Sequence, residues 1–251
     1  MPERPPLSRS RWSIAAVADF VLVHGGFHGG WCWSRVADIL RGHGHRVWTP
    51  TLTGLGERSH LLAPGIDLTT HINDIVNVLR WESITDAVLC GHSYGGMVIT
   101  GVADRARERV RRLIYLDAAV PEHGQSFLDL MGNGAAVIAQ ARAQGDGYRV
   151  PPISAEGFGI EQADDRAWVD SLTTAQPLAT CTEPLSFQHA GGPTLPRTYI
   201  HALRARRRSG DIHAALVDRA DWRTRTIDCG HEVMIDRPDE LAAMLIEEAA
   251  A

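Results

Sequence analysis

Short apolar runs alternate along the chain with longer segments in which apolar residues recur every three or four positions. The short runs predict strands at Phe20–Val23, Arg46–Thr49, Ala87–Cys90, Leu113–Leu116, Thr198–Ala202 and Arg225–Asp228. The longer segments predict helices at Trp33–Arg41, Thr70–Arg80, Gly95–Arg107, Ile212–Arg219 and Pro238–Ala250. Such alternation favours an α/β fold with a parallel sheet and crossover helices. Active sites in these sheets lie at the carboxyl ends of the strands.

The alternation stops between Pro121 and Pro196, where Gly- and Pro-rich turns separate apolar residues at mixed spacing. The stretch is too long for a plain loop, so we expect a small helical cap at 121–196, inserted over the strand ends. The core is then expected at 19–120 and 197–251. Residues 1–18, rich in Pro, Arg and Ser, are expected to form a mobile extension.

Composition narrows the possible functions. The 251 residues are 44% hydrophobic and 22% charged, and their net charge of -5 implies no basic patch for nucleic acid or an anionic membrane. All 25 basic residues are Arg, which excludes chemistry that needs a lysine amine. Four scattered cysteines without CxxC spacing are typical of a reduced, intracellular chain, and no run reaches the roughly 20 apolar residues of a membrane span. We expect a cytoplasmic protein.

A Gly-x-Ser-x-Gly element centred on Ser93 is the strongest chemical signal. It follows a predicted buried strand and precedes a predicted helix, which is the context of a nucleophile on a sharp strand-to-helix turn. The glycines at 91 and 95 avoid clashes there, and the helix amino end points free amides at the serine. We predict that Ser93 is a nucleophile rather than an idle turn residue.

A second signal, His24-Gly25-Gly26, leaves the first predicted strand. A turn of this kind can aim one backbone amide toward the serine. Together with the amide of Tyr94 it would form a two-donor oxyanion hole. The alternative is that this segment is a tight turn with a structural role only, in which His24 packs beneath the turn.

A serine nucleophile needs a base, and His231 follows the last predicted strand, as the chain order Ser, Asp, His requires. A zinc site at His24 with His28, or at His43 with His45, lacks a supporting Cys or carboxylate cluster. A zinc site at either pair is therefore disfavoured.

These motifs resemble the α/β-hydrolase superfamily, and within it the branch of plant methylesterases, plant hydroxynitrile lyases and bacterial esterase relatives. The resemblance rests on 24–31, 50–56, 91–96 and 177–180 and covers nearly the whole chain. It implies a mostly parallel six-stranded sheet with a helical cap, a Ser93–His231–Asp triad, and oxyanion amides from Gly26 and Tyr94. It also implies that the protein uses no metal and no organic cofactor.

The resemblance places the triad acid after the Thr198–Ala202 strand, which favours Asp211, 20 residues before His231. Asp117, at the end of the Leu113–Leu116 strand, is the alternative. Asp228 lies too close to the histidine in sequence, and capping is the better role for Asp236.

The expected reaction is hydrolysis of a small ester with an apolar or aromatic part, through an acyl-enzyme. Phe27, Trp168 and Leu178 are predicted to contact the substrate. A carbamate, amide or lactone substrate stays open, as does a homodimer. A cyanohydrin lyase is disfavoured, because the resemblance leads us to expect Thr at 25 and Lys after the base, where this chain has Gly25 and Glu232. A non-catalytic binding protein would be expected to have lost part of the triad or of the oxyanion turn.

Overall fold

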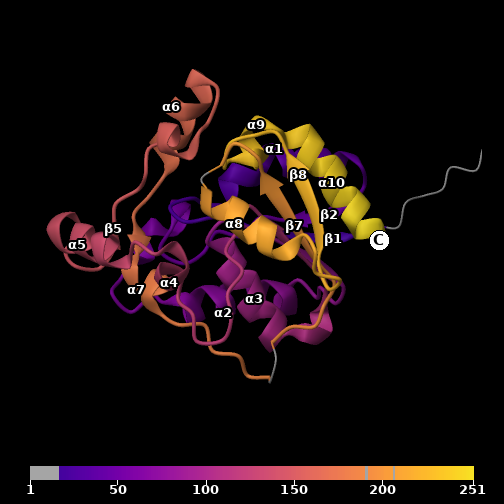
Figure 1. The fold of residues 1–251 in the computed structure, drawn as a ribbon, viewed down its shortest axis with the longest axis horizontal. Helices are drawn as coiled ribbons and strands as arrows, with labels where there is room; N and C mark the ends of the chain where they lie inside the picture. Colours follow the sequence, from indigo (N-terminus) through magenta and orange to yellow (C-terminus); the bar gives the residue numbers. More distant parts are fainter. Residues whose placement is uncertain (1–16, 190–191, 206) are drawn as a thin grey trace, which may run out of the picture.

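A six-stranded parallel sheet forms the centre of the computed structural model, which describes residues 17–189, 192–205 and 207–251 (Figure 1). The strand order is β2-β1-β3-β4-β7-β8, and every neighbouring pair is parallel. The expected extension at 1–18 lies almost entirely outside the described residues. The strands are β1 (Asp19–Val23), β2 (Arg46–Trp48), β3 (Ala87–His92), β4 (Val110–Leu116), β7 (Arg197–Ala202) and β8 (Arg223–Ile227).

The two faces of the sheet carry separate hydrophobic clusters. In β1, Phe20 and Leu22 pack toward α1 and α10, while Val21 and Val23 pack toward α2 and α3. Side chains alternate across a strand, so a strand covered on both faces reads as an unbroken apolar run. The core helices are α1 (Ser34–Gly42), α2 (Leu68–Trp81), α3 (Gly95–Arg105), α8 (Arg207–Leu216), α9 (Val233–Asp236) and α10 (Pro238–Ala250).

The segment between β4 and β7 carries its own helices and a small antiparallel ribbon. Its helical segments α5 and α6 project from the body of the molecule, away from the central sheet (Figure 1). We refer to this segment, residues 121–196, as the cap. Its elements are α4 (Phe127–Met131), α5 (Gly134–Gln144), β5 (Arg149–Val150), α6 (Ala163–Leu172), β6 (Gln176–Pro177) and α7 (Leu178–Thr182). Short 3-10 helices lie at Gly30–Trp33, Gly56–Leu61, Arg107–Arg109 and Ala155–Phe158.

Each predicted core strand and helix is present, with shifts at the ends. The largest shift is in α8, which begins at Arg207 rather than at Ile212. The extra turn contains Arg207 and Arg208, and arginine is a good helix former although it adds nothing to an apolar periodicity. Among the described residues, none of the helices has the length and apolar character needed to cross a membrane.

Candidate active site

Ser93 lies on a sharp turn between β3 and α3, with a positive φ of 54°. A Cβ on Gly91 would lie 2.6 Å from the Gly95 carbonyl oxygen, and one on Gly95 would lie 2.8 Å from the Val23 carbonyl oxygen. Both positions therefore require glycine, which explains the spacing of the motif. Backbone strain at a non-glycine residue of this kind is typical of a functional position.

Tyr94 begins the helix after the serine, and its side chain is anchored away from the cavity. Its hydroxyl donates to Nδ1 of His71 at 3.0 Å, and Nε2–H of His71 donates to the Thr53 carbonyl at 2.8 Å. Within the described part of the chain, no carbonyl or side chain accepts from the Tyr94 amide. This amide is thus free to bind an anion at the helix amino end.

Residues 24–28 follow β1, and we call them the oxyanion turn after the role predicted for the Gly26 amide. The buried His24 side chain holds this turn in place. Nδ1–H of His24 donates to the Gly25 carbonyl at 2.8 Å, and the Leu52 amide donates to Nε2 at 3.0 Å. These contacts require the neutral ring, and burial lowers the pKa of His24 to about 3. The peptide that His24 holds is the one that carries the Gly26 amide.

The cap holds the other side of the oxyanion turn. Phe27 has a φ of 69°, its amide donates to Gln176 Oε1 at 3.1 Å, and its carbonyl accepts from the Thr174 amide at 2.9 Å. In the described residues the Gly26 amide has no acceptor. Gly26 and Ser93 line the same cavity, so the amide predicted at Gly26 is available there.

His231 follows β8, and Asp117 follows β4. Nδ1 of His231 lies 2.6 Å from Oδ2 of Asp117, while Oδ1 of Asp117 accepts from the Ala202 amide at 3.2 Å. The aspartate side chain is 1% exposed and the histidine side chain 20% exposed. A buried carboxylate on Nδ1 leaves Nε2 as the nitrogen that can take a proton from the serine.

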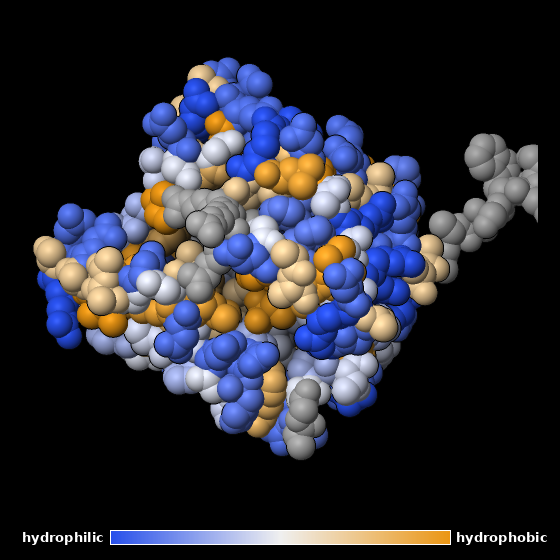
Figure 2. Space-filling model, in the orientation of Figure 1, coloured by the Kyte–Doolittle hydropathy of each residue, from blue (hydrophilic) through white to orange (hydrophobic). Residues whose placement is uncertain are grey.

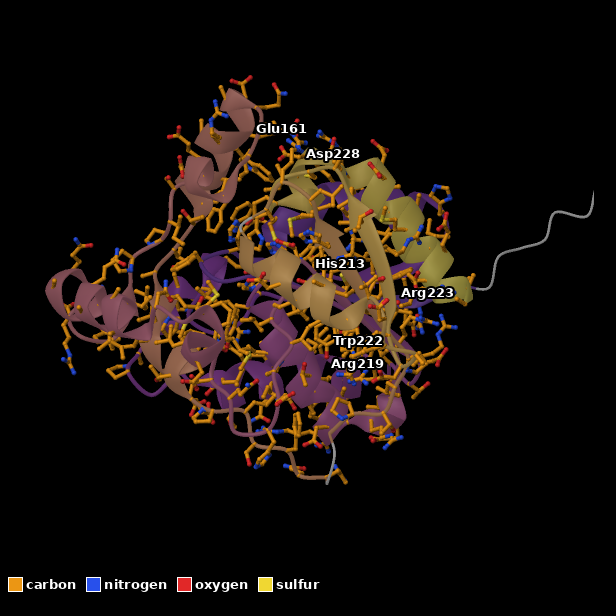
Figure 3. The ribbon with its side chains drawn as sticks, in the orientation of Figure 1. Glu161, His213, Arg219, Trp222, Arg223 and Asp228 are labelled. Carbon is orange, nitrogen blue, oxygen red and sulfur yellow. The ribbon has the colours of Figure 1, made fainter. Side chains whose placement is uncertain are left out.

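The structure contradicts the assignment of Asp211 as the carboxylate that orients His231. Asp117 already occupies Nδ1, and one ring nitrogen cannot serve two carboxylates. Asp211 is exposed on α8 and lines a separate cavity of about 840 Å³, which Tyr115 and Trp222 also line. Arg219 and Trp222, which are labelled in Figure 3, also line this cavity and lie between the end of α8 and the start of β8.

His92, inside the turn, connects the Ser93 turn to the segment that carries His231. Nε2–H of His92 donates to the His231 backbone carbonyl at 3.0 Å, and the two rings lie 4.4 Å apart. Burial lowers the pKa of His92 to about 4, so its ring is neutral near pH 7. This contact uses the His231 backbone, is separate from the Asp117 contact with the ring, and fixes the loop that carries His231.

The cavity above Ser93 has a volume of about 360 Å³ and is mostly apolar. Figure 2 shows hydrophobic residues gathered between the α5 side of the molecule and the sheet, on a face that is otherwise largely hydrophilic. Phe27 lines the cavity as predicted, together with Ser93 and His231. The cap contributes Phe127, Leu128, Leu130, Met131, Val137 and Phe158.

Trp168 and Leu178, predicted to contact the substrate, do not line this cavity. Trp168 packs its ring against Trp31 at 5.1 Å and beneath the Arg35 guanidinium at 5.4 Å. It therefore docks α6 onto the core. Leu178 begins α7, and its amide donates to the Tyr148 carbonyl at 2.8 Å inside the cap.

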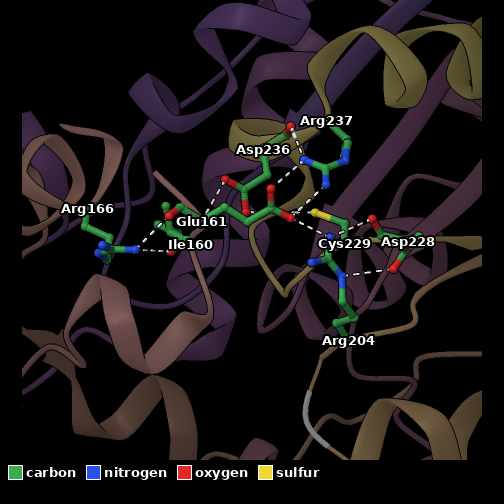
Figure 4. A network of polar contacts seen from close by, with 8 residues as sticks. All are labelled: Ile160, Glu161, Arg166, Arg204, Asp228, Cys229, Asp236 and Arg237. Atoms are coloured by element: carbon green, nitrogen blue, oxygen red, sulfur yellow. Dashed lines mark hydrogen bonds and ion pairs between the residues drawn. The ribbon is translucent and has the colours of Figure 1, made fainter. Parts of the chain in front are cut away.

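A network of charges joins the cap to the core beside the cavity (Figures 3 and 4). Glu161 of the cap accepts from Arg204, and its Oε1 accepts from Arg237 at 2.7 Å. Arg204 also contacts Asp228, through Nε at 2.9 Å from Oδ1. Since Arg204 lines the cavity, this network sets the position of the cap at the cavity wall.

Three metal-ligating side chains come close together beside the cavity. Ligand atoms of His92, His231 and Glu232 lie within 4.8 Å of one another. Nδ1 of His231 is bound to Asp117 and Nε2 of His92 to a backbone carbonyl. Two of the ring nitrogens in this grouping therefore already have hydrogen-bond partners.

Sequence reasoning missed the roles of His92, Gln176 and the cap ion network. The buried position of His92 next to the serine was visible, but its partner lies 139 residues away. Gln176 and Glu161 are polar residues in a segment without periodicity, and no local signal marked them.

The chain is similar in sequence and in fold to known hydrolases. A family model described as "Alpha/beta hydrolase family" matches residues 20–244. The chain is 43% identical over 239 residues to "Carbendazim hydrolyzing esterase" of Nocardioides sp. (strain SG-4G), covering 91% of this chain and 98% of that protein. It is 27% identical to "Methylesterase 10" of Arabidopsis thaliana, covering 92% of this chain and 91% of that one.

Solved structures share the fold at lower sequence identity. An extracellular α/β-hydrolase from a Paenibacillus species superimposes with a TM-score of 0.78 at 20% identity, covering 92% of this chain and 98% of that chain. The pyrethroid hydrolase PytH superimposes with a TM-score of 0.74 at 20% identity, covering 94% and 98%.

Proposed function

Because the chain belongs to the α/β-hydrolase family, we propose that it hydrolyses small, uncharged carboxylic esters through an acyl-enzyme on Ser93. The observation that carries the proposal is one cavity that holds the strained Ser93, the His231–Asp117 pair and the oxyanion turn. Its mostly apolar cap lining suits an ester with an apolar or aromatic part.

In the proposed reaction, His231 takes the proton of Ser93 as the oxygen attacks the acyl carbon. Asp117 holds the ring with Nδ1 protonated and stabilises the imidazolium. The amides of Gly26 and Tyr94 bind the negative oxygen of the tetrahedral intermediate. His231 then gives its proton to the leaving alcohol, and a water molecule releases the acid in a second round of the same steps.

Carbendazim is a second candidate substrate, favoured by the relative that is 43% identical over nearly its full length. Carbamates, amides and lactones belong in the same panel, because they need the same nucleophile and oxyanion donors. These substrates differ in the leaving group that His231 must protonate and in the shape that the cavity must accept.

A cyanohydrin lyase is less compatible with the geometry. A Cβ at Gly25 would lie 2.9 Å from His92 Nδ1 and 3.0 Å from the Ser93 Cβ, so no threonine fits there without movement. Glu232 is fully buried and does not line the cavity. The position that would supply a cation for cyanide therefore supplies neither a positive charge nor a contact.

Fluorophosphonate labelling and turnover of p-nitrophenyl acetate test the proposal directly. The wild type should be labelled at Ser93, and Ser93→Ala should lose labelling and on the order of 10⁶ in turnover while keeping its fold. Turnover of Ser93→Ala within about tenfold of the wild type would show that Ser93 is not the nucleophile.

A further inference from the structure

Glu232 is a buried carboxylate that the proposed reaction does not use. Its side chain has no exposed surface, and neither carboxylate oxygen has a hydrogen-bond partner among the described residues. Nε2 of His28 lies 3.6 Å from Glu232 Oε2. A buried carboxylate without a partner is costly, so the contact with His28 must compensate for its burial.

The partners of His28 determine where its protons lie. Nδ1 of His28 lies 2.7 Å from the Gly26 carbonyl oxygen, and a carbonyl can only accept, so Nδ1 carries a proton. Nε2 of a neutral ring would then present a bare lone pair to the carboxylate. One further proton between Nε2 and Glu232 turns this repulsion into an attraction.

Charges around Glu232 act in the same direction. Burial disfavours the carboxylate anion, but attraction to the neighbouring histidines, of which His28 has the largest effect, outweighs burial and lowers the pKa of Glu232. His28 also packs between Trp31, at a ring distance of 5.2 Å, and Phe158, at 5.4 Å, so its ring has little freedom to turn. The His28–Glu232 pair is therefore a fixed contact within the site's supporting layer.

This contact joins the two segments that must stay in register during the reaction. His28 holds the Gly26 carbonyl, which lies one peptide group after the Gly26 amide that is the proposed oxyanion donor. Glu232 directly follows His231, the proposed base, in the sequence. We propose that Glu232, acting through His28, is a positioning residue that fixes the oxyanion turn relative to the base. The proposal rests on the hydrolytic function proposed above.

Glu232→Met tests it, because methionine keeps the length of the side chain and removes its polar oxygens. We expect kcat to fall about 10- to 100-fold with KM changed less than about threefold, since the oxyanion donor is displaced while the cavity remains. The inhibition constant of a trifluoromethyl ketone, which forms a tetrahedral oxyanion on the serine, should rise by the same factor.

Glu232→Gln is the conservative variant. Its amide N–H can donate to the bare Nε2 of a neutral His28, so one proton still lies between the two side chains. Its kcat and its trifluoromethyl ketone affinity should stay within about threefold of the wild type. In a His28→Phe background, Glu232→Met should add little further loss, because its effect passes through His28.

Glu248→Gln is the matched control for stability. Glu248 is an equally buried glutamate, 1% exposed, but it bonds Arg112 at 3.2 Å and Thr198 at 2.7 Å, near the opposite ends of the strands. It should lower the melting temperature without changing kcat of the folded enzyme.

Four outcomes separate the possibilities. A fully active Glu232→Met, or a loss that leaves the trifluoromethyl ketone affinity unchanged, overturns the positioning role. So does a full additional loss in the His28→Phe background. If the wild type neither labels with fluorophosphonate nor hydrolyses any ester of the panel, the proposed hydrolytic function itself has failed.

Discussion

Asp117→Asn distinguishes an acid on β4 from an acid on the β7–α8 connection. The Ala202 amide donates to Oδ1 of Asp117, and an asparagine must keep its oxygen on that side to accept the same bond. Its NH₂ group then faces His231 Nδ1, where Oδ2 lies 2.6 Å away in the wild type. Asparagine also tolerates the positive φ of 45° at this position, so the fold should survive.

The expected loss follows from the tautomer. An NH₂ donor forces Nδ1 to be an acceptor, so the ring proton moves to Nε2 and the serine loses its base. A tautomer error of this kind costs up to about 10⁴ in kcat. This corresponds to about 5 kcal/mol of transition-state stabilisation. The melting temperature should change much less than the activity.

Steady-state hydrolysis of p-nitrophenyl acetate and the rate of fluorophosphonate labelling should both fall by this factor. Asp211→Asn is the matched control, with the same chemical change on the exposed face of α8, and it should stay within about twofold of the wild type. An active Asp117→Asn beside an inactive, folded Asp211→Asn would refute the reasoning.

Three further predictions follow from other contacts. Burial lowers the pKa of His24 to about 3 and of His71 and His92 to about 4. Below about pH 6.5, the ordinary pKa of histidine, these three residues bind more protons in the unfolded chain than in the folded one. The free energy of unfolding should therefore be highest above that pH and fall as the pH drops toward 4, by up to about 4 kcal/mol per pH unit. Equal urea midpoints at pH 7 and pH 5 would contradict this. Glu161→Gln should raise KM more than it lowers kcat, because it frees the cap from Arg204 and Arg237, and high salt should move the wild type toward the variant. Mandelonitrile cleavage should stay near background, and efficient release of cyanide would restore the lyase alternative.

The fold was largely predictable from the sequence because its core strands are buried on both faces. An unbroken apolar run such as Ala87–Cys90 predicts a buried strand from the local sequence alone. The turn at Ser93 is sterically so close that only glycine fits at 91 and 95, which makes its motif recognisable. The family model confirms the α/β-hydrolase resemblance, and the six-stranded parallel sheet is present.

The carboxylate beside His231 was not predictable in the same way. Both Asp117 and Asp211 follow a strand, and the resemblance favoured Asp211, whereas Asp117 lies beside His231 in the structure. The choice depends on which carboxylate reaches a histidine 114 residues from Asp117, and this is decided by the packing of β4 beside β7. The prediction that Trp168 contacts the substrate differs from the structure for a related reason. An aromatic residue of the cap can face the cavity or the core, and the mixed spacing of apolar residues in the cap does not distinguish the two.

The proposed acid at the end of β4 changes what can be engineered in this protein. The loop after β7 contributes Arg204 and Ala205 to the cavity wall, and Nδ1 of His231 is bound to Asp117 of the β4 end rather than to a described residue of this loop. Randomised loops grafted between β7 and α8 can therefore alter which substrates enter, while Ser93, His231 and Asp117 stay on segments that the library does not change. A scaffold of this kind suits directed evolution, since the screening effort falls on selectivity instead of on recovering lost catalysis.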